Sequence, residues 1–347
     1  MKNLRLALAA ALLCPLTLLA QAPADAISSA PGTQTAASTP AAPVDPFPPV
    51  DRKFFTATTP TVDTVNAFLK ALWGYDPNRL FRVMAIQTTA APGVAKVTIF
   101  VTDRSPGAKV GSLTFYITPD GKHAIAEGAG VVPFAADPFA DIRAKLLAQA
   151  DGATRGAPGK GFELVEFADL QCPHCKEAQS TIDQIVKDFP GAHVVFQLFP
   201  LIDIHPSAFK AAAYGVCVQK QSNDLFFSYA AGVFDTQEAL TAASEETVLK
   251  AAVKRAGLDA DAIAACAATP GTKDIVNADI KLGEDVGVDQ TPLLAINGRL
   301  VPMGQVPYEQ LKQIIVYQAA MDGVPTGAAP DILTPKPDEP NPSSPAQ

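Results

Sequence analysis

The chain has 347 residues, of which 48% are hydrophobic and 18% charged, and its formal net charge at pH 7 is −8. This length and composition fit two domains, each with its own core, better than one. The acidic balance and the lack of a basic stripe interleaved with aromatic residues exclude nucleic acid as an expected partner.

The first 22 residues have the pattern of a secretory signal peptide. Lys2 and Arg5 form a basic start, residues 6–20 an apolar run, and residues 20–22 (AQA) a small-x-small cleavage site. We therefore expect an exported protein that is periplasmic or otherwise extracytoplasmic. An uncleaved signal that tethers the chain to the membrane is the alternative.

Two further segments are low in complexity. Residues 23–53 are mostly Ala, Pro, Thr and Ser, and residues 323–347 are rich in proline. Segments of this composition bury too little apolar surface to offset the entropy of folding. Both are expected to be disordered.

Residues 54–136 predict a small α+β domain. Residues 61–75 read as an amphipathic helix with its apolar residues on one side. Strand patterns follow at 81–89, 94–102 and 110–118, and another strand is expected from His123, after the turn signal at 119–122. This domain has no cysteine and no obvious catalytic group. Residues 137–160 are expected to be a linker helix followed by a Gly/Pro-rich break.

The motif Cys172-Pro173-His174-Cys175 lies between an apolar strand pattern over 162–168 and a helical pattern over 177–189. Pro173 suits the first helical position, so Cys172 is placed at the helix N-terminus. Free N–H groups and the helix dipole there favour a thiolate. Cys175, three residues on, returns within disulfide reach. His174 can lower the pKa of Cys172 further by donating to the thiolate, although an exposed spacer residue is the alternative.

The second domain is expected over residues 161–322. After the motif helix come a strand, a helical section, a strand, a hairpin arm and a final helix, at 193–198, about 206–286, 293–296, 299–301 and 308–320. Strands interleaved with crossover helices indicate an α/β sheet covered by helices on both faces.

Removal of the signal peptide leaves four cysteines, Cys172, Cys175, Cys217 and Cys266. Export permits disulfides, and four cysteines allow three connectivities. A structural zinc site needs two more closely spaced Cys or His ligands, which the four histidines of the chain do not supply. We therefore expect no metal and no cofactor.

The second domain resembles the DsbA-like thiol-disulfide oxidoreductases, which are thioredoxin folds with a helical insertion. The resemblance rests on the CPHC motif after a strand, the helical section, and Thr291-Pro292 before LLAINGRLV. The expected fold class is thus α/β, a thioredoxin-like fold with a helical insertion, preceded by a small α+β domain and flanked by disordered termini.

This resemblance implies roles for further residues. It makes Pro292 a cis proline which, with Thr291, faces the cysteines and binds substrate backbone. It makes Glu166 a buried acid that assists proton transfer at Cys175, while a strand residue facing solvent is the alternative. It makes Cys217 and Cys266 a structural bridge, with two buried free thiols or a second redox pair as alternatives.

The sequence is compatible with three functions. The first is an exported oxidoreductase that transfers disulfides to unfolded or cysteine-containing exported proteins and is recycled by a membrane or soluble redox partner. The second is an isomerase or reductase, because residues 113–127 resemble part of the dimerisation domain of DsbC-type isomerases, which implies a possible homodimer. The third is a peptide-binding module in which the CxxC disulfide is structural.

Overall fold

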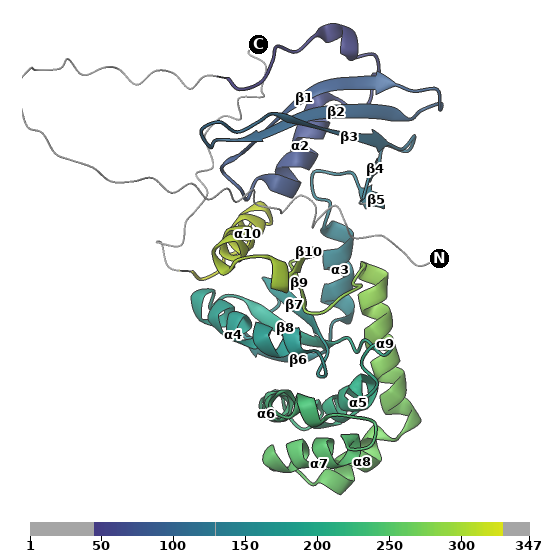
Figure 1. The fold of residues 1–347 in the computed structure, drawn as a ribbon, viewed down its shortest axis with the longest axis vertical. Helices are drawn as coiled ribbons and strands as arrows, with labels where there is room; N and C mark the ends of the chain where they lie inside the picture. The colour runs from purple at the N-terminus through teal and green to yellow at the C-terminus, as the bar shows by residue number, and fades with distance from the viewer. Residues whose placement is uncertain (1–44, 129, 329–347) are drawn as a thin grey trace, which may run out of the picture.

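The computed structural model describes residues 45–128 and 130–328. They form an N-terminal unit built on an antiparallel sheet and a C-terminal unit built on a mixed sheet with many helices (Figure 1). The expected signal peptide over 1–22 and most of both low-complexity ends lie outside the described residues. No helix within the described ranges is long and apolar enough to cross a membrane.

The N-terminal unit packs one helix against a five-stranded sheet. Its elements are η1 (Arg52–Phe54), α2 (Val62–Trp73), β1 (Arg79–Thr88), β2 (Ala95–Asp103), β3 (Gly111–Ile117), β4 (His123–Ala126) and β5 (Gly130–Pro133). The strands are antiparallel neighbours in chain order. The apolar side of α2, with Val65, Phe68 and Leu69, is buried against alternate residues such as Val97 and Phe115. The expected α+β domain is present.

Part of each low-complexity segment packs on the fold, contrary to the expectation of disorder. Asp45 pairs with Arg82 at 2.7 Å, and the buried ring of Phe47 lies under the Arg82 guanidinium. At the other end, the carbonyl of Thr326 accepts a hydrogen bond from the backbone N–H of Gly191. A single aromatic residue or a backbone pair is enough to hold such a segment, and composition does not show this.

The C-terminal unit is a five-stranded sheet with helices on both faces. Its elements are α3 (Ala140–Gln149), β6 (Ala153–Gly156), β7 (Glu163–Ala168), α4 (Pro173–Asp188), β8 (His193–Leu198), α5 (Ala208–Gln219), α6 (Asn223–Asp235), η2 (Gln237–Ala239), α7 (Glu245–Arg255), α8 (Ala260–Ala267), α9 (Pro270–Val286), β9 (Leu293–Ile296), β10 (Arg299–Pro302), η3 (Met303–Gln305) and α10 (Tyr308–Met321). The strand order is β10-β9-β7-β8-β6.

Helices α4 and α10 cover one face of this sheet, and α3 and α9 cover the other. Leu164 and Val165, neighbours on β7, point to opposite faces and belong to the two different cores. Helices α5 to α8 pack around Tyr214, Phe226 and Leu249, in a core that they share with Phe196 of β8 and with Cys172 and Cys175. They form the helical insertion between β8 and α9 (Figure 1).

The sheet starts earlier than the sequence pattern indicates. Strand β6, within the segment expected to be a Gly/Pro-rich break, pairs antiparallel with β8 from Ala153 to Gly156. Its four residues are held by a partner about forty positions downstream, and such a pairing leaves no local periodicity.

The topology brings three loops to one edge of the sheet. Strands β7 and β8 are parallel, so their carboxyl ends meet at the same edge. Strand β9 runs antiparallel to β7 and therefore begins at that edge. The loop that carries Cys172, the loop after β8 and the loop that ends in Pro292 thus converge.

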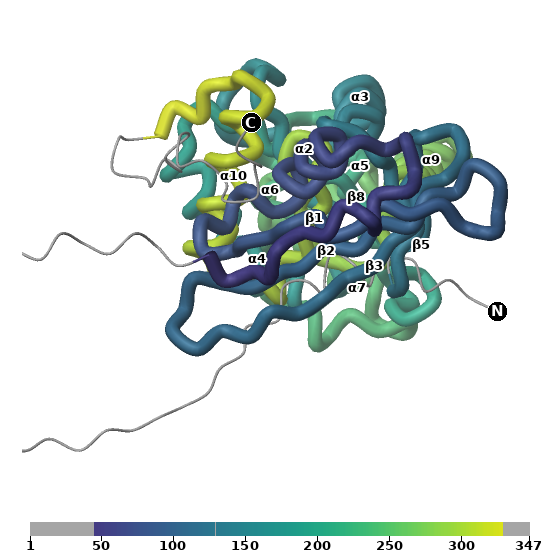
Figure 2. The backbone as a smooth tube through the Cα atoms, turned by 90° about the horizontal axis from the view of Figure 1, so that it is seen from above, coloured from purple at the N-terminus to yellow at the C-terminus, as the bar shows by residue number. Residues whose placement is uncertain are grey.

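The two units are in direct contact. Arg299 on β10 donates to the backbone carbonyls of Ala71 and Leu72 at the end of α2, and the Tyr317 hydroxyl donates to the Lys70 carbonyl at 2.6 Å. Gly74 follows α2 at this contact, because a Cβ there would lie 2.2 Å from the Tyr317 hydroxyl. Figure 2 shows the N-terminal sheet lying over the C-terminal unit.

Candidate active site

Cys172 is the residue before the first turn of α4. Its backbone is extended, and Pro173 occupies the first helical turn as the motif predicts. Cys172 and Cys175 are both free thiols; Cys172 is 4% exposed and Cys175 is fully buried. Both thiols are buried, and Cys172 is the less buried of the two.

The two thiols have opposite acid strengths. The Cys175 thiol, by hydrogen bonding to the Cys172 sulfur, is the largest cause that lowers the pKa of Cys172 to about 5, and the backbone N–H groups of Cys175 and His174 add to it. Burial raises the pKa of Cys175 well above its usual range, and the neighbouring Cys172 raises it further. At neutral pH, Cys172 is the thiolate and Cys175 keeps its proton.

The side chain of His174 does not contact Cys172. It is 72% exposed, and its Nδ1 lies 3.1 Å from the Glu177 carboxylate. Its backbone N–H, fixed by the first turn of α4, is the group that helps to lower the pKa of Cys172. The hydrogen bond to Glu177 and its negative charge raise the pKa of His174, and the charge of Cys172 raises it further, so a charged imidazole and the Cys172 thiolate stabilise each other.

Thr291 and Pro292 lie opposite the cysteines. The peptide bond between them is cis, as the resemblance implies. The Cys172 sulfur lies 3.8 Å from the backbone carbonyl oxygen of Thr291, to which the thiol donates when it is protonated. The hydroxyl of Thr291 is buried beside the two cysteines, where its hydrogen bonding acts to lower the pKa of both thiols.

Glu166 is fully buried in β7 and does not face solvent. Its Oε1 accepts a 2.7 Å hydrogen bond from Gln179, and its Oε2 lies 3.4 Å from the Arg155 guanidinium. Burial raises the pKa of this carboxyl to about 7 against the opposing effect of Arg155. Gln179 also donates to the backbone carbonyl of Cys175 at 3.0 Å, which connects the acid to the inner cysteine.

The sequence reasoning missed the partners of Glu166. Gln179 follows Cys175 by four residues, so both lie on one face of α4, and this helical spacing was a usable signal. Arg155 comes from β6, the strand that the sequence pattern does not reveal, so its approach to Glu166 had no local signal.

Polar side chains outside the motif hold the loop that leads to Cys172. The Gln237 amide donates to the carbonyls of Leu170 (3.0 Å) and Cys172 (2.9 Å). The buried Asp169 donates its backbone N–H to the Cys175 sulfur at 3.4 Å, and its carboxylate lies 2.7 Å from Nδ1 of His205. The helical insertion and the loop after β8 therefore fix the position of both cysteines.

Cys217 and Cys266 form the disulfide that the resemblance implies, with a Cα–Cα distance of 6.1 Å. It links α5 to α8 inside the helical insertion. Closing a loop with a sequence separation of 49 stabilises the fold by at most about 4 kcal/mol in the chain-entropy model. The bridge stabilises the insertion and lies outside the dithiol site.

The fold and this dithiol define a redox-active domain of the thioredoxin type. The family model described as thioredoxin matches residues 150–316, just under half of the chain. Residues 150–316 therefore form a thioredoxin-family domain. The match begins just before β6, in agreement with the start of the observed sheet.

Solved structures and curated proteins give further similarities. Proteus mirabilis ScsC is 23% identical with a TM-score of 0.43, covering 52% of this chain and 81% of the other. The Wolbachia pipientis thiol-disulfide exchange protein α-DsbA2 is 20% identical with a TM-score of 0.43, covering 51% and 95%. A Na⁺/H⁺ antiporter, NhaA 3 of Salinispora tropica, is 26% identical over 149 residues, 42% of this chain. The chain spans less than a quarter of the length of the curated relatives that it matches.

Proposed function

We propose that the protein is an exported oxidoreductase that transfers disulfides to cysteine-containing protein substrates. The observation that carries the proposal is the split in acid strength at the dithiol, with the pKa of Cys172 lowered to about 5 beside a buried, protonated Cys175. A stable Cys172 thiolate favours the reduced form, which makes the disulfide form a strong oxidant.

The reaction proceeds through a mixed disulfide. A substrate thiolate attacks the Cys172 sulfur of the Cys172–Cys175 disulfide, and Cys175 leaves and takes a proton. A second substrate thiolate then attacks the substrate sulfur of the mixed disulfide and releases the Cys172 thiolate. The substrate dithiol has lost two electrons and two protons. The protein has gained the two electrons and one proton, at Cys175, and the second proton goes to solvent because Cys172 is released as the thiolate. We assign to Glu166, whose pKa is about 7, the role of supplying or accepting the Cys175 proton, and the Gln179 amide that bonds both Glu166 and the Cys175 carbonyl supports this assignment.

The peptide on either side of the substrate cysteine binds along the loop that ends in Pro292. The main chain of this loop is available to it there, and the Thr291 hydroxyl lies beside the two sulfurs. Unfolded exported proteins are therefore the proposed substrates, and a membrane or soluble redox partner is proposed to reoxidise the dithiol. The signal-peptide pattern of residues 1–22 and the Cys217–Cys266 bridge support an oxidising compartment such as the periplasm.

The test is oxidation of a reduced, unfolded peptide with two cysteines by the purified disulfide form. We expect stoichiometric peptide disulfide and free Cys172 and Cys175 thiols. Cys172→Ser should abolish the reaction. Reduced Cys175→Ser, mixed with a peptide that contains a disulfide, should accumulate the mixed disulfide at Cys172, because no Cys175 thiol is present to resolve it. Failure of the wild-type disulfide form to oxidise the peptide would reject the proposal.

Isomerisation or reduction is the second candidate. The N-terminal sheet domain favours it, because a unit packed on the redox domain can add a binding surface or form a homodimer. A dimer in solution together with refolding of a scrambled disulfide protein would support this candidate over the oxidase.

A further inference from the structure

The N-terminal sheet leaves part of β3 without a strand on one side. Strand β2 pairs with β3 along its whole length, from Gly111 to Ile117. On the other side, β4 pairs only with Phe115–Ile117. In residues 45–128 and 130–328, therefore, no strand lies beside the first four residues of β3, all of which are exposed. An open strand edge offers main-chain hydrogen bonds to another chain.

The direction of these free groups follows from the register. The backbone N–H of Thr118 points to the β4 side, where it donates to the His123 carbonyl at 3.0 Å. Main-chain groups alternate in direction along a strand, so Ser112 presents its N–H and C=O to the same, open side. Ser112 is the centre of the open edge.

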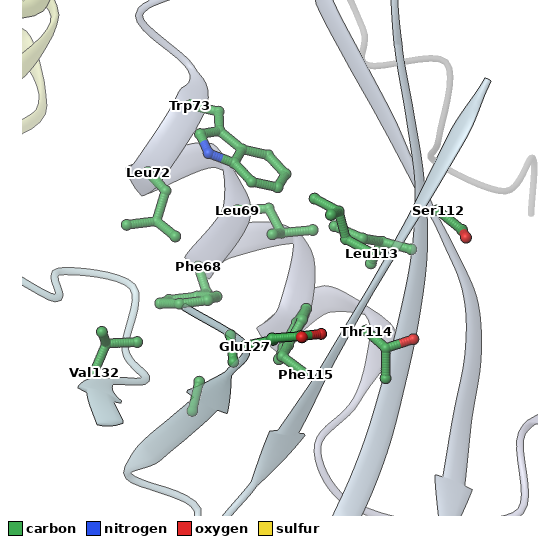
Figure 3. Close-up of a pocket in the computed structure, with 13 residues that line it drawn as sticks. Phe68, Leu69, Leu72, Trp73, Ser112, Leu113, Thr114, Phe115, Glu127 and Val132 are labelled. Carbon is green, nitrogen blue, oxygen red and sulfur yellow. The ribbon is translucent and has the colours of Figure 1, made fainter. Parts of the chain in front are cut away.

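An apolar pocket of about 440 Å³ lies next to this edge, between α2 and β3 (Figure 3). This volume is in the range of peptide side-chain and small-ligand pockets. Leu113 and Phe115 of β3 line it from one side, and Phe68, Leu72 and Trp73 of α2 line it from the other. Leu113 is 38% exposed, so an apolar wall of the pocket is open to solvent.

One acidic side chain marks the rim of the pocket. Glu127 lines it just after the end of β4, is exposed, and has no ion pair within the described part of the chain. Figure 3 shows its carboxylate directed toward the space between α2 and β3. A negative charge beside an apolar pocket complements a segment in which an apolar residue is followed by Lys or Arg.

We propose that this edge and pocket bind an extended stretch of unfolded polypeptide, which adds to the sheet as a strand beside Ser112. One of its apolar side chains enters the pocket, and a basic side chain lies near Glu127. Main-chain pairing gives affinity without a fixed sequence, and the pocket selects apolar residues. The site contains no thiol, so its ligand needs no cysteine. The peptide-binding proposal can therefore be confirmed or rejected independently of the redox proposal.

Trp73 reports on the site directly, because it is the only tryptophan of the chain and lines the pocket. The probe is a synthetic peptide of about eight residues, the length of a typical strand, with alternating Val and Thr, one Lys, and no Cys or Trp. Titrated into the full-length protein, it should change the Trp73 emission in a saturable way. An emission that stays unchanged while calorimetry also detects no binding would overturn the proposal.

A pair of variants at Ser112 tests the strand edge. Ser112→Pro removes the N–H on the open edge. An edge strand tolerates proline at such a position, so the fold should persist while peptide binding weakens by roughly tenfold or more. Ser112→Ala keeps the N–H and should bind within roughly twofold of wild type, because no main-chain bond is lost. Equal binding by the two variants would contradict strand addition.

A second pair tests the pocket on the same strand. Leu113→Ser removes a pocket wall and should weaken binding by roughly tenfold. Tyr116→Ser is the matched control: Tyr116 is also on β3 and 40% exposed, but it points to the opposite face of the sheet and should leave binding unchanged.

A second copy of this chain could occupy the β3 edge in place of a peptide. Sedimentation of the protein without peptide measures the oligomeric state that tests this alternative. If the protein is a dimer that Ser112→Pro converts to a monomer, a second copy fills the edge and the peptide proposal is wrong. An oligomeric state that is the same in Ser112→Pro and Ser112→Ala supports it.

Discussion

The guanidinium of Arg299, on the last strand of the thioredoxin sheet, donates to the backbone carbonyl of Leu72 at 3.0 Å, at the C-terminal end of α2 in the other unit. The last carbonyls of a helix have no partner within the helix and carry partial negative charge. Arg299 satisfies two of them, and its charge lies over the rings of Tyr75 and Phe139. This contact fixes the N-terminal sheet relative to the redox domain.

Replacing Arg299 by Met should destabilise the contact. Burial lowers the pKa of Arg299 to about 10, so the residue is still charged at neutral pH, and its loss leaves buried helix carbonyls unpaired. We expect the free energy of unfolding to fall by about 2–4 kcal/mol, and the two units to separate in limited proteolysis. Denaturant unfolding measures the first effect.

The matched control for this prediction is Arg255→Met. Arg255 is 60% exposed and pairs with an exposed Asp235. Its removal should change stability by less than about 1 kcal/mol, as for other surface ion pairs. Equal losses in the two variants would show that the contact between the units carries no special energy.

Glu166 should make the stability of the fold fall as pH rises. Its pKa is about 7 in the folded protein against 4.5 for the free side chain, so between these values the native state holds a proton that the unfolded chain has released. The free energy of unfolding should then decrease by about 3 kcal/mol from pH 4.5 to pH 7.

Glu166→Gln should remove this decrease. Asp279 is buried, with a pKa raised to about 7, and contributes with the same sign, so the comparison is the difference in slope between wild type and variant. Unfolding curves collected across this pH range provide it. Parallel curves for the two proteins would mean that Glu166 is ionised in the native state throughout.

The acid strength of Cys172 should depend on Cys175. Alkylation of Cys172 in the reduced protein should rise with a midpoint near pH 5, because only the thiolate reacts. Cys175→Ala removes the hydrogen bond that contributes most and should move the midpoint upward. Cys175→Ser keeps a donor and should move it less. A midpoint that is the same in all three proteins would assign the low pKa to the helix terminus alone.

The Cys217–Cys266 bridge should affect stability and leave the chemistry unchanged. The double variant Cys217→Ala/Cys266→Ala should lose up to about 4 kcal/mol of unfolding free energy. The alkylation midpoint of Cys172 should stay the same, since the hydrogen bonds that lower its pKa come from Cys175, Thr291 and His174 and none involves the bridge. A shifted midpoint would reveal coupling between the insertion and the active site.

The sequence predicts the parts of this molecule that depend on local pattern. The strand-to-helix setting of Cys172 and Pro173, the helical section and the helix α2 all follow from spacing along the chain. The resemblance adds the thioredoxin fold and the place of Pro292. The features that the sequence does not predict depend on contacts between distant residues. Strand β6 pairs with β8, Gln237 donates to the carbonyl of Cys172, and Arg299 donates to the end of α2. No local period encodes those contacts.

The edge of β3 and its pocket were also hidden in the sequence. The strand from Gly111 was expected, and so was the return at His123. The sequence does not show that β4 stops opposite Phe115, because strand length is set by the partner chain and by the turn that follows.

The reduction potential of the Cys172–Cys175 couple tests the central claim most directly. Equilibration with glutathione buffers and quantification of the two thiols would measure it. A stabilised Cys172 thiolate predicts an oxidising couple, with a potential near roughly −120 mV. A potential near roughly −270 mV would place the protein among the reductants and contradict disulfide donation.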